Sequence, residues 1–236
     1  MDRVLDIEPK DIEAKLLLAF MEVHWKAQTA PLRQLVDSLR ISHPASVPNT
    51  GIADFWLFCA LVERDAAAAE MALTALGERS VDYEGVHLSP SFLEGLIARM
   101  TKDDVRARRA FTRARAEQEK VVQAEAMYGP PLCVLGLIDA ALGRKEEALR
   151  EGRRAVELLP VQKDAIKGAH IIQFFSMIAA WIGDKDLACE QLATALLYPS
   201  LLSYGELKLQ PWWDPLRGDP RFEKLVEESK EPVAIK

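Results

Sequence analysis

Residues that could carry chemistry are present in this sequence, but they are scattered. The histidines His24, His43, His87 and His170 lie far apart, and no two of them form the HExxH spacing of a zinc-dependent hydrolase. No serine or cysteine stands in a recognisable nucleophile motif, and the glycines form no phosphate-binding loop. The sequence therefore predicts no catalytic site, no metal site and no cofactor.

The three cysteines point the same way. Cys59, Cys133 and Cys189 are widely separated, and each falls inside an apolar stretch. An odd number without a CxxC pair predicts neither a disulfide framework nor a zinc site. We expect three buried thiols that behave as small apolar side chains in a reducing compartment.

The strongest local concentration of charge runs from Arg99 to Lys120, where eight basic and four acidic residues give a net charge of +4. The whole chain carries −6, and this acidic balance argues against broad nucleic-acid binding. The asymmetry is typical of a docking face for an acidic segment or for a second copy of the chain. An ordinary exposed helix is the alternative, because charged helical faces are common. The candidates for a partner contact are Arg106, Arg109 and Arg113.

The elements that must position such residues are predicted to be helices. Alanine and leucine are abundant, and long alternating runs of β-branched residues are absent, which favours helices throughout. Turn signals recur at Arg64-Asp65, Lys102-Asp103, Gly143-Arg144 and Gly183-Asp184, in steps of 38, 41 and 40 residues. A fixed period in this range is typical of a helical repeat protein.

The clearest repeat runs from Leu132 to Pro160. Its first helix carries Gly136, where a small residue lets the facing helix approach, and Gly143 is suited to a helix end that needs positive φ. Pro160 ends the second helix. The apolar stripe of that helix consists of Ala148, Ala155, Leu158 and Leu159.

These positions carry a resemblance to a known family. Gly136, Gly143, Ala148, Ala155 and Pro160 resemble the small-residue and terminal-proline pattern of tetratricopeptide repeats. The observed step is longer than the roughly 34 residues of that family. Two of the family's aromatic positions are occupied here by Leu132 and Gly152. A weaker form of the pattern recurs at Ser176, Gly183, Ala188, Ala195 and Pro199.

The resemblance implies an all-α fold: a right-handed solenoid of about five antiparallel helix pairs with a C-terminal capping helix, forming one domain over 1–236. It also implies that the first helix of each pair lines a concave groove. The polar and aromatic residues that it places there are Arg99, His170, Gln173 and Trp181. The alternative is that groove positions are simply core, which we favour for the apolar Phe58, Leu137 and Met177. The predicted helix pairs lie at about 10–42, 51–78, 89–124, 130–160 and 163–199, with the cap at 200–230.

The C-terminal sequence WDPLRGDPRF has the start signals of a capping helix, with Asp219 as the N-cap and Pro220 in the first turn. It is similar to the end of tetratricopeptide regions in large bacterial serine/threonine kinases, nucleotide cyclases and winged-helix regulators. The N-terminus, with a proline at Pro9, resembles the second half of a repeat. We therefore expect a fragment or a shortened relative of a longer protein, with a free-standing chain as the alternative.

Together these features predict a non-catalytic interaction module whose partner is a protein or peptide segment, a sister domain or a second copy. A ligand-sensing regulatory domain of a larger bacterial signalling protein is the first alternative, and an enzyme with an unrecognised site is the second. The longest apolar run, Ile171 to Ile182, is too short to span a bilayer, and the start of the chain does not resemble a signal peptide. We expect a cytoplasmic location, or an extracytoplasmic one if the chain belongs to a membrane-anchored kinase.

Overall fold

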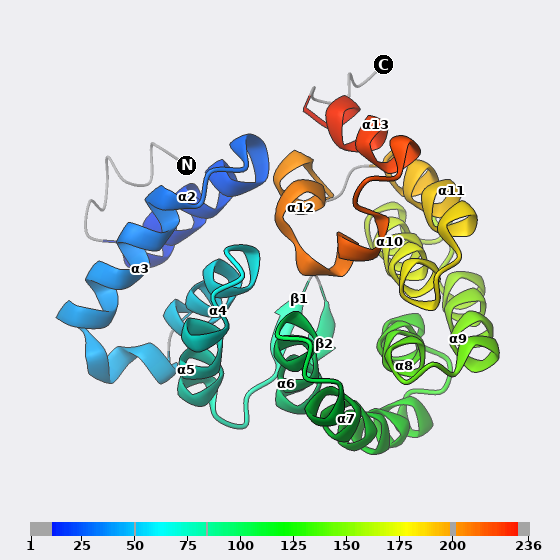
Figure 1. Cartoon of the computed structure of the whole chain (residues 1–236), viewed down its shortest axis with the longest axis horizontal. Helices are drawn as coiled ribbons and strands as arrows, with labels where there is room; N and C mark the ends of the chain where they lie inside the picture. The colour runs from blue at the N-terminus through cyan, green and yellow to red at the C-terminus, as the bar shows by residue number, and fades with distance from the viewer. Residues whose placement is uncertain (1–10, 50, 84, 199–201, 231–236) are drawn as a thin grey trace. The chain divides into compact units, whose positions relative to one another are not determined.

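The structure is a computed structural model that describes residues 11–49, 51–83, 85–198 and 202–230, and most of these residues are helical (Figure 1). Its contacts divide into two compact units. Unit 1 runs to Gly77 and also contains Ser203–Pro211, whereas unit 2 contains Glu78–Leu202 and the chain from Trp212 onward. The predicted helical class is therefore confirmed. The predicted Pro9 signal lies outside the described residues.

Unit 1 is a set of helices that takes one helix from a distant part of the sequence. Helix α12 packs on α2, and His24 Nδ1 lies 2.9 Å from the hydroxyl of Ser203, the N-cap of α12. A side chain at Gly205 would collide with the backbone carbonyl of Val23, so glycine permits this close approach. The elements of unit 1 are α2 (Ile12–Lys26), α3 (Ala30–Ser42), the 3-10 helix η1 (Pro44–Asn49), α4 (Ile52–Val62), α5 (Ala66–Leu76) and α12 (Tyr204–Leu209).

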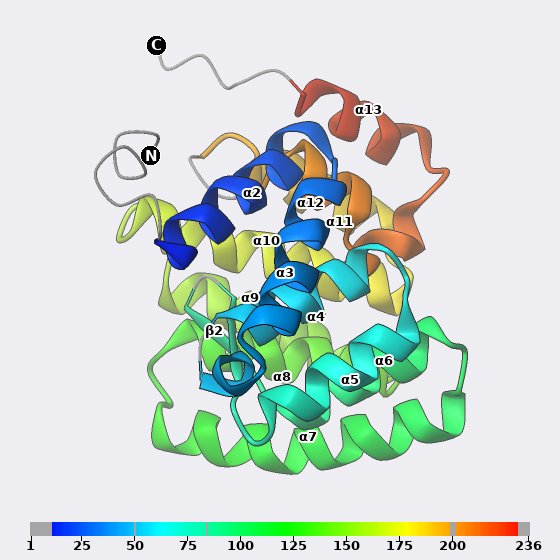
Figure 2. The ribbon, with the colours of Figure 1, turned by 90° about the vertical axis from the view of Figure 1, so that its left-hand side faces the viewer.

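Unit 2 places helix α8 at its centre, where it packs on α7, α9 and α10. Figure 2 shows α7, which has 21 residues, along its full length. The helices are α6 (Pro90–Met100), α7 (Asp104–Ala124), α8 (Gly129–Ala141), α9 (Lys145–Leu158), α10 (Ala165–Ile182), α11 (Lys185–Ala195) and α13 (Pro220–Glu228). The remaining elements are β1 (Val81–Tyr83), β2 (Val86–Leu88) and the 3-10 helix η2 (Pro211–Leu216), which begins at the last residue of unit 1.

The same backbone motif ends the first helix of four successive helix pairs, at the four turns that the sequence predicted. Arg64, Lys102, Gly143 and Gly183 all have positive φ, between 59° and 90°. The residue after each of them donates its backbone N–H to a carbonyl five residues earlier, at 2.9 Å in every case. This pattern is the Schellman end of a helix. Three of the following helices are then capped by the next side chain, from Asp65, Asp103 and Asp184.

Two glycines explain how the helices of unit 2 approach one another. A Cβ at Gly136 would lie 3.1 Å from the carbonyl oxygen of Ala148, which confirms that a small residue is needed between α8 and α9. A Cβ at Gly152 would lie 2.5 Å from Cδ2 of Phe175. The ring of Phe175 from α10 therefore occupies the space beside Gly152.

The sequence prediction of helices throughout was wrong at residues 81–88. Strands β1 and β2 pair antiparallel, with Val81 opposite Leu88 and Tyr83 opposite Val86. Gly85, with φ 81°, lies in the turn. The alternation spans only three residues on each strand, too short a window to show a period of two. We call this element, Val81–Leu88, the hairpin.

A helix, α13, begins where the start signals at Asp219 and Pro220 predicted one, whereas α12, which also lies in the range predicted for the cap, belongs to unit 1. Asp219 is the N-cap of α13 and accepts the backbone N–H of Arg221 at 3.0 Å. Phe222 is fully buried and packs against Trp213, with ring centroids 6.1 Å apart. Val226 completes the buried stripe.

Helix α10 is the one helix in the described part of the chain whose length and composition would allow it to cross a membrane. In the structure 83% of this 18-residue window is buried. The core helix of a globular fold has the same properties, so the feature is weak evidence for a membrane span.

Candidate functional site

The groove residues predicted on α10 are buried in unit 2. His170, Gln173 and Trp181 are 2%, 1% and 8% exposed. The ring of Tyr83, from the hairpin, lies 5.5 Å from that of His170, and Trp181 Nε1 donates to the carbonyl oxygen of Trp212 at 2.9 Å. These residues are therefore covered by other parts of the chain, which matches the alternative that they are core.

Arg99 joins this buried layer from α6. Its guanidinium lies over the Trp181 ring, 4.2 Å from the centroid, which is a favourable cation–π geometry. Burial lowers the pKa of the Arg99 guanidinium, and the nearby Asp214 opposes that effect. Arg99 thus stabilises the packing of α6 on α10.

The three predicted basic-face residues on α7 behave differently from one another. Arg106 and Arg113 both pair with Glu94 of α6. Arg113 also donates from Nε to the Ser91 hydroxyl at 2.8 Å. Arg109 is exposed. Two of the three candidates therefore hold α7 against α6, and a docking role for the basic residues of α7 stays a prediction.

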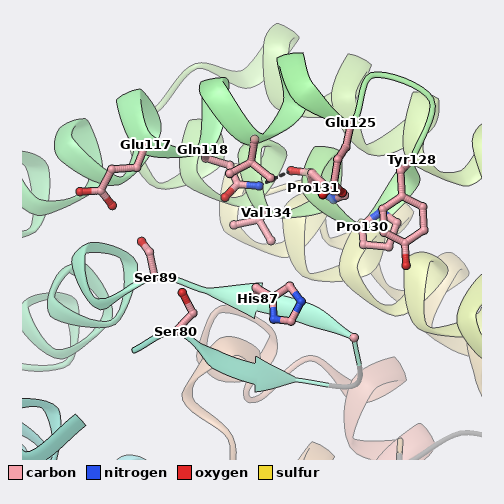
Figure 3. Close-up of a pocket in the computed structure, with 12 residues that line it drawn as sticks. Ser80, His87, Ser89, Glu117, Gln118, Glu125, Tyr128, Pro130, Pro131 and Val134 are labelled. Carbon is pink, nitrogen blue, oxygen red and sulfur yellow. Dashed lines mark hydrogen bonds between the residues drawn. The ribbon is translucent and has the colours of Figure 1, made fainter. Parts of the chain in front are cut away.

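A hollow with both polar and apolar walls lies elsewhere in unit 2, between the hairpin and helices α7 and α8 (Figure 3). Its volume is about 310 Å³. We call it the hairpin cleft. It is lined by Ser80, Gly85, His87, Ser89, Glu117, Gln118, Val121, Glu125, Tyr128, Pro130, Pro131 and Val134.

The α7 wall of the cleft is a regular stripe. Glu117 and Val121 are four residues apart and share one face of α7, and Glu125, the C-cap residue directly after the helix, follows after another four. Gln118 lies beside them, and its side-chain amide donates to the Pro131 carbonyl at 2.9 Å, which ties α7 to the start of α8. Apolar surface continues at the rim, because Val121 is 41% and Tyr128 37% exposed.

The charge of the cleft is negative. Glu117 accepts a hydrogen bond from the Ser91 hydroxyl at 2.8 Å. Within the described ranges, neither Glu117 nor Glu125 has an ion-pair partner, and no lysine or arginine lines the cleft. Two carboxylates are thus available to a cation from outside.

The hairpin forms the opposite wall and has two chemically distinct faces. Val86 and Leu88 are buried against the core. His87 and Asp82 lie opposite each other on the other face, with Nδ1 and Oδ2 3.4 Å apart and side chains 73% and 57% exposed. Figure 3 shows His87 on β2, the strand nearer to the α7–α8 wall.

A second group of carboxylates lies inside unit 2. Asp139 of α8 is fully buried, accepts a hydrogen bond from Arg115 Nε at 2.6 Å and forms an ion pair with Arg144, whose Nε lies 3.1 Å from Oδ1. Burial, together with the neighbouring Asp139 carboxylate, raises the pKa of Glu151 to about 8. This cluster joins α7, α8 and α9, and the charge of Asp139 is neutralised by arginines of the same cluster. We therefore regard it as structural.

Metal-binding groups and reactive thiols were the two other kinds of site that the sequence raised. No group of three or more His, Cys, Asp or Glu side chains that could hold a metal ion occurs there. The three cysteines are buried as predicted. Burial raises the pKa of the Cys59 thiol to about 12 and also raises that of Cys133, which disfavours the reactive thiolate.

The sequence analysis missed the hairpin cleft. The available signals were the i, i+4, i+8 spacing of Glu117, Val121 and Glu125, and the short alternating segments on either side of Gly85. Comparison with family models, with curated proteins and with solved structures found no match.

Proposed function

We propose that this chain is a non-catalytic interaction module of tetratricopeptide type that binds a segment of another protein in the hairpin cleft. The observation that carries the proposal is the cleft itself: apolar surface at Val121, Pro131 and Val134, flanked by side chains that can accept hydrogen bonds or charge. Sites for peptides combine an apolar floor with a few polar groups in this way.

The repeated turn motif supports the assignment to this repeat type. In four helix pairs the first helix ends in the same backbone geometry, and Gly136 and Gly152 lie where neighbouring helices meet. The proposal takes the pairs as units of a right-handed solenoid with α13 as its cap. Because the α10 face is filled by Tyr83 and Trp212, it assigns binding to the cleft and not to the face of α10.

A peptide-display selection against the full chain tests this function. We expect saturable binding that is lost in Val121→Trp, because the indole would fill the mouth of the cleft. Val105→Trp is the matched control: it lies on the same helix, is 83% exposed and is not among the residues that line the cleft. If no peptide binds, or if both variants bind like the original chain, the proposal is wrong.

A further inference from the structure

The spacing of charges in the hairpin cleft indicates what kind of segment it takes, if the cleft is the binding site proposed above. Glu117 lies on α7 and Glu125 is the C-cap residue at its end, eight residues later, which corresponds to about 12 Å along the helix axis. Val121 lies midway between them. The α7 wall is therefore a row of acidic, apolar and acidic groups at steps of about 6 Å.

An extended peptide has a matching repeat. Successive side chains on one face of a β-strand are about 6.6 Å apart, so its residues i, i+2 and i+4 would face the three groups of the wall. A cation can then approach each carboxylate while the middle side chain contacts Val121. Neither carboxylate has a competing ion-pair partner in the described part of the chain.

The hairpin favours the extended conformation on independent grounds. In the described structure β2 pairs with β1 alone, so its other edge, which faces the α7–α8 wall, has no neighbouring strand, and an extended segment is the kind of ligand that adds to such an edge.

We propose that the hairpin cleft recognises an extended segment with the pattern basic, any, apolar, any, basic. The two basic side chains pair with Glu117 and Glu125, and the apolar side chain rests on Val121 between them. His87, across the cleft, adds a polar contact from β2. The partner is thus a protein that exposes a short basic and apolar strand, not an acidic segment.

Three fluorescein-labelled peptides test this inference by anisotropy with the full chain. The first has lysines at positions 2 and 6 and leucine at position 4 of a serine- and glycine-based heptamer. The second has the same composition with the two lysines adjacent, and the third has glutamates in place of lysines. We expect the first to bind about fivefold more tightly than the second, as two exposed ion pairs would allow, and the third not to bind measurably.

Variants of the chain then test whether the preference for the first peptide comes from Glu117 and Glu125 on the α7 wall of the cleft. Glu117→Gln with Glu125→Gln should remove the preference for the first peptide, whereas Glu146→Gln with Glu190→Gln, the same charge change at exposed positions of α9 and α11, should keep it. If the peptides bind in a Val121-dependent way without preferring the spaced lysines, the inference is overturned while the proposed function stands. If the display selection yields no Val121-dependent ligand at all, both are overturned.

Discussion

Unit 2 contains two pairs of carboxylates that differ in what surrounds them. Asp139 and Glu151 lie inside the unit, where Arg115 and Arg144 pair with Asp139. Glu117 and Glu125 line the hairpin cleft and have no cation beside them among the described residues. Helix α7 contributes to both regions, because Arg115 and Glu117 are only two residues apart and face different sides.

The difference shows how one helix separates stability from recognition. A buried carboxylate is tolerated only when cations or hydrogen-bond donors compensate its lost hydration, so removing one member of such a cluster is costly. An exposed carboxylate keeps its hydration and contributes little to folding, which leaves its charge for a partner. The comparison therefore predicts opposite outcomes for chemically similar substitutions.

The largest effect is expected at Asp139. Asp139→Asn removes the charge that two arginines contact, and we expect a loss of about 2 to 3 kcal/mol in the free energy of unfolding. Urea denaturation measures this. The control is Asp186→Asn, which breaks an Asp–Arg pair with Arg221 at an aspartate that is 88% exposed and should cost less than about 1 kcal/mol. Equal losses in the two variants would contradict the comparison.

A smaller, pH-dependent effect is expected at Glu151. Burial first, and the Asp139 charge second, raise its pKa from the ordinary 4.5 to about 8 in the folded chain. The folded state then binds more protons than the unfolded state between these values, so this group makes the chain less stable as pH rises from 4.5 to 8.

Glu151→Gln has no carboxyl group at this position and should therefore avoid the fall in stability between pH 4.5 and 8. After allowance for solvent screening at this half-buried side chain, we expect the variant to be about 1 to 2 kcal/mol more stable than the original chain at pH 9, with the difference disappearing below pH 4.5. Urea denaturation at several pH values measures the change. Glu146→Gln on the same helix is exposed and should show no such trend. If the free energy of unfolding of Glu151→Gln varied with pH as it does in the original chain, Glu151 would not be the group that binds the proton between pH 4.5 and 8.

The smallest effect on stability is expected in the cleft. Glu125→Gln should change the free energy of unfolding by less than about 0.5 kcal/mol, because the side chain is exposed and makes no ion pair with the described residues. Thermal unfolding is a sufficient measurement. A loss approaching that of Asp139→Asn would mean that Glu125 belongs to the structural group.

The local features of the fold were predictable from the sequence. Gly143, Gly183 and the aspartates after the turns specify helix ends through backbone geometry and capping, which depend only on neighbouring residues. Each predicted pair range contains two helices, although α8 begins one residue early. The packing of the pairs into one solenoid domain stays a prediction.

The candidate site was not predictable, for a physical reason. The cleft depends on a hairpin of three-residue strands and on its contact with helices some thirty residues later. Likewise, the burial of His170 and Gln173 depends on where Tyr83 and Trp212 pack, which periodicity along α10 does not reveal. Side chains that meet across long sequence separations need the tertiary structure.

Unit 1 combines the N-terminal helices with Ser203–Pro211, a segment that follows most of unit 2 in the sequence, and this has a consequence for synthesis on the ribosome. Helices α2 to α5 leave the ribosome early, yet α12 must still dock on α2, with Gly205 against Val23 and the Ser203 hydroxyl at His24. The surface of α2 that binds α12 therefore stays uncovered until most of unit 2 has been translated. Closing so long a loop is entropically slow, so the α12–α2 contact is expected to form among the last steps of folding.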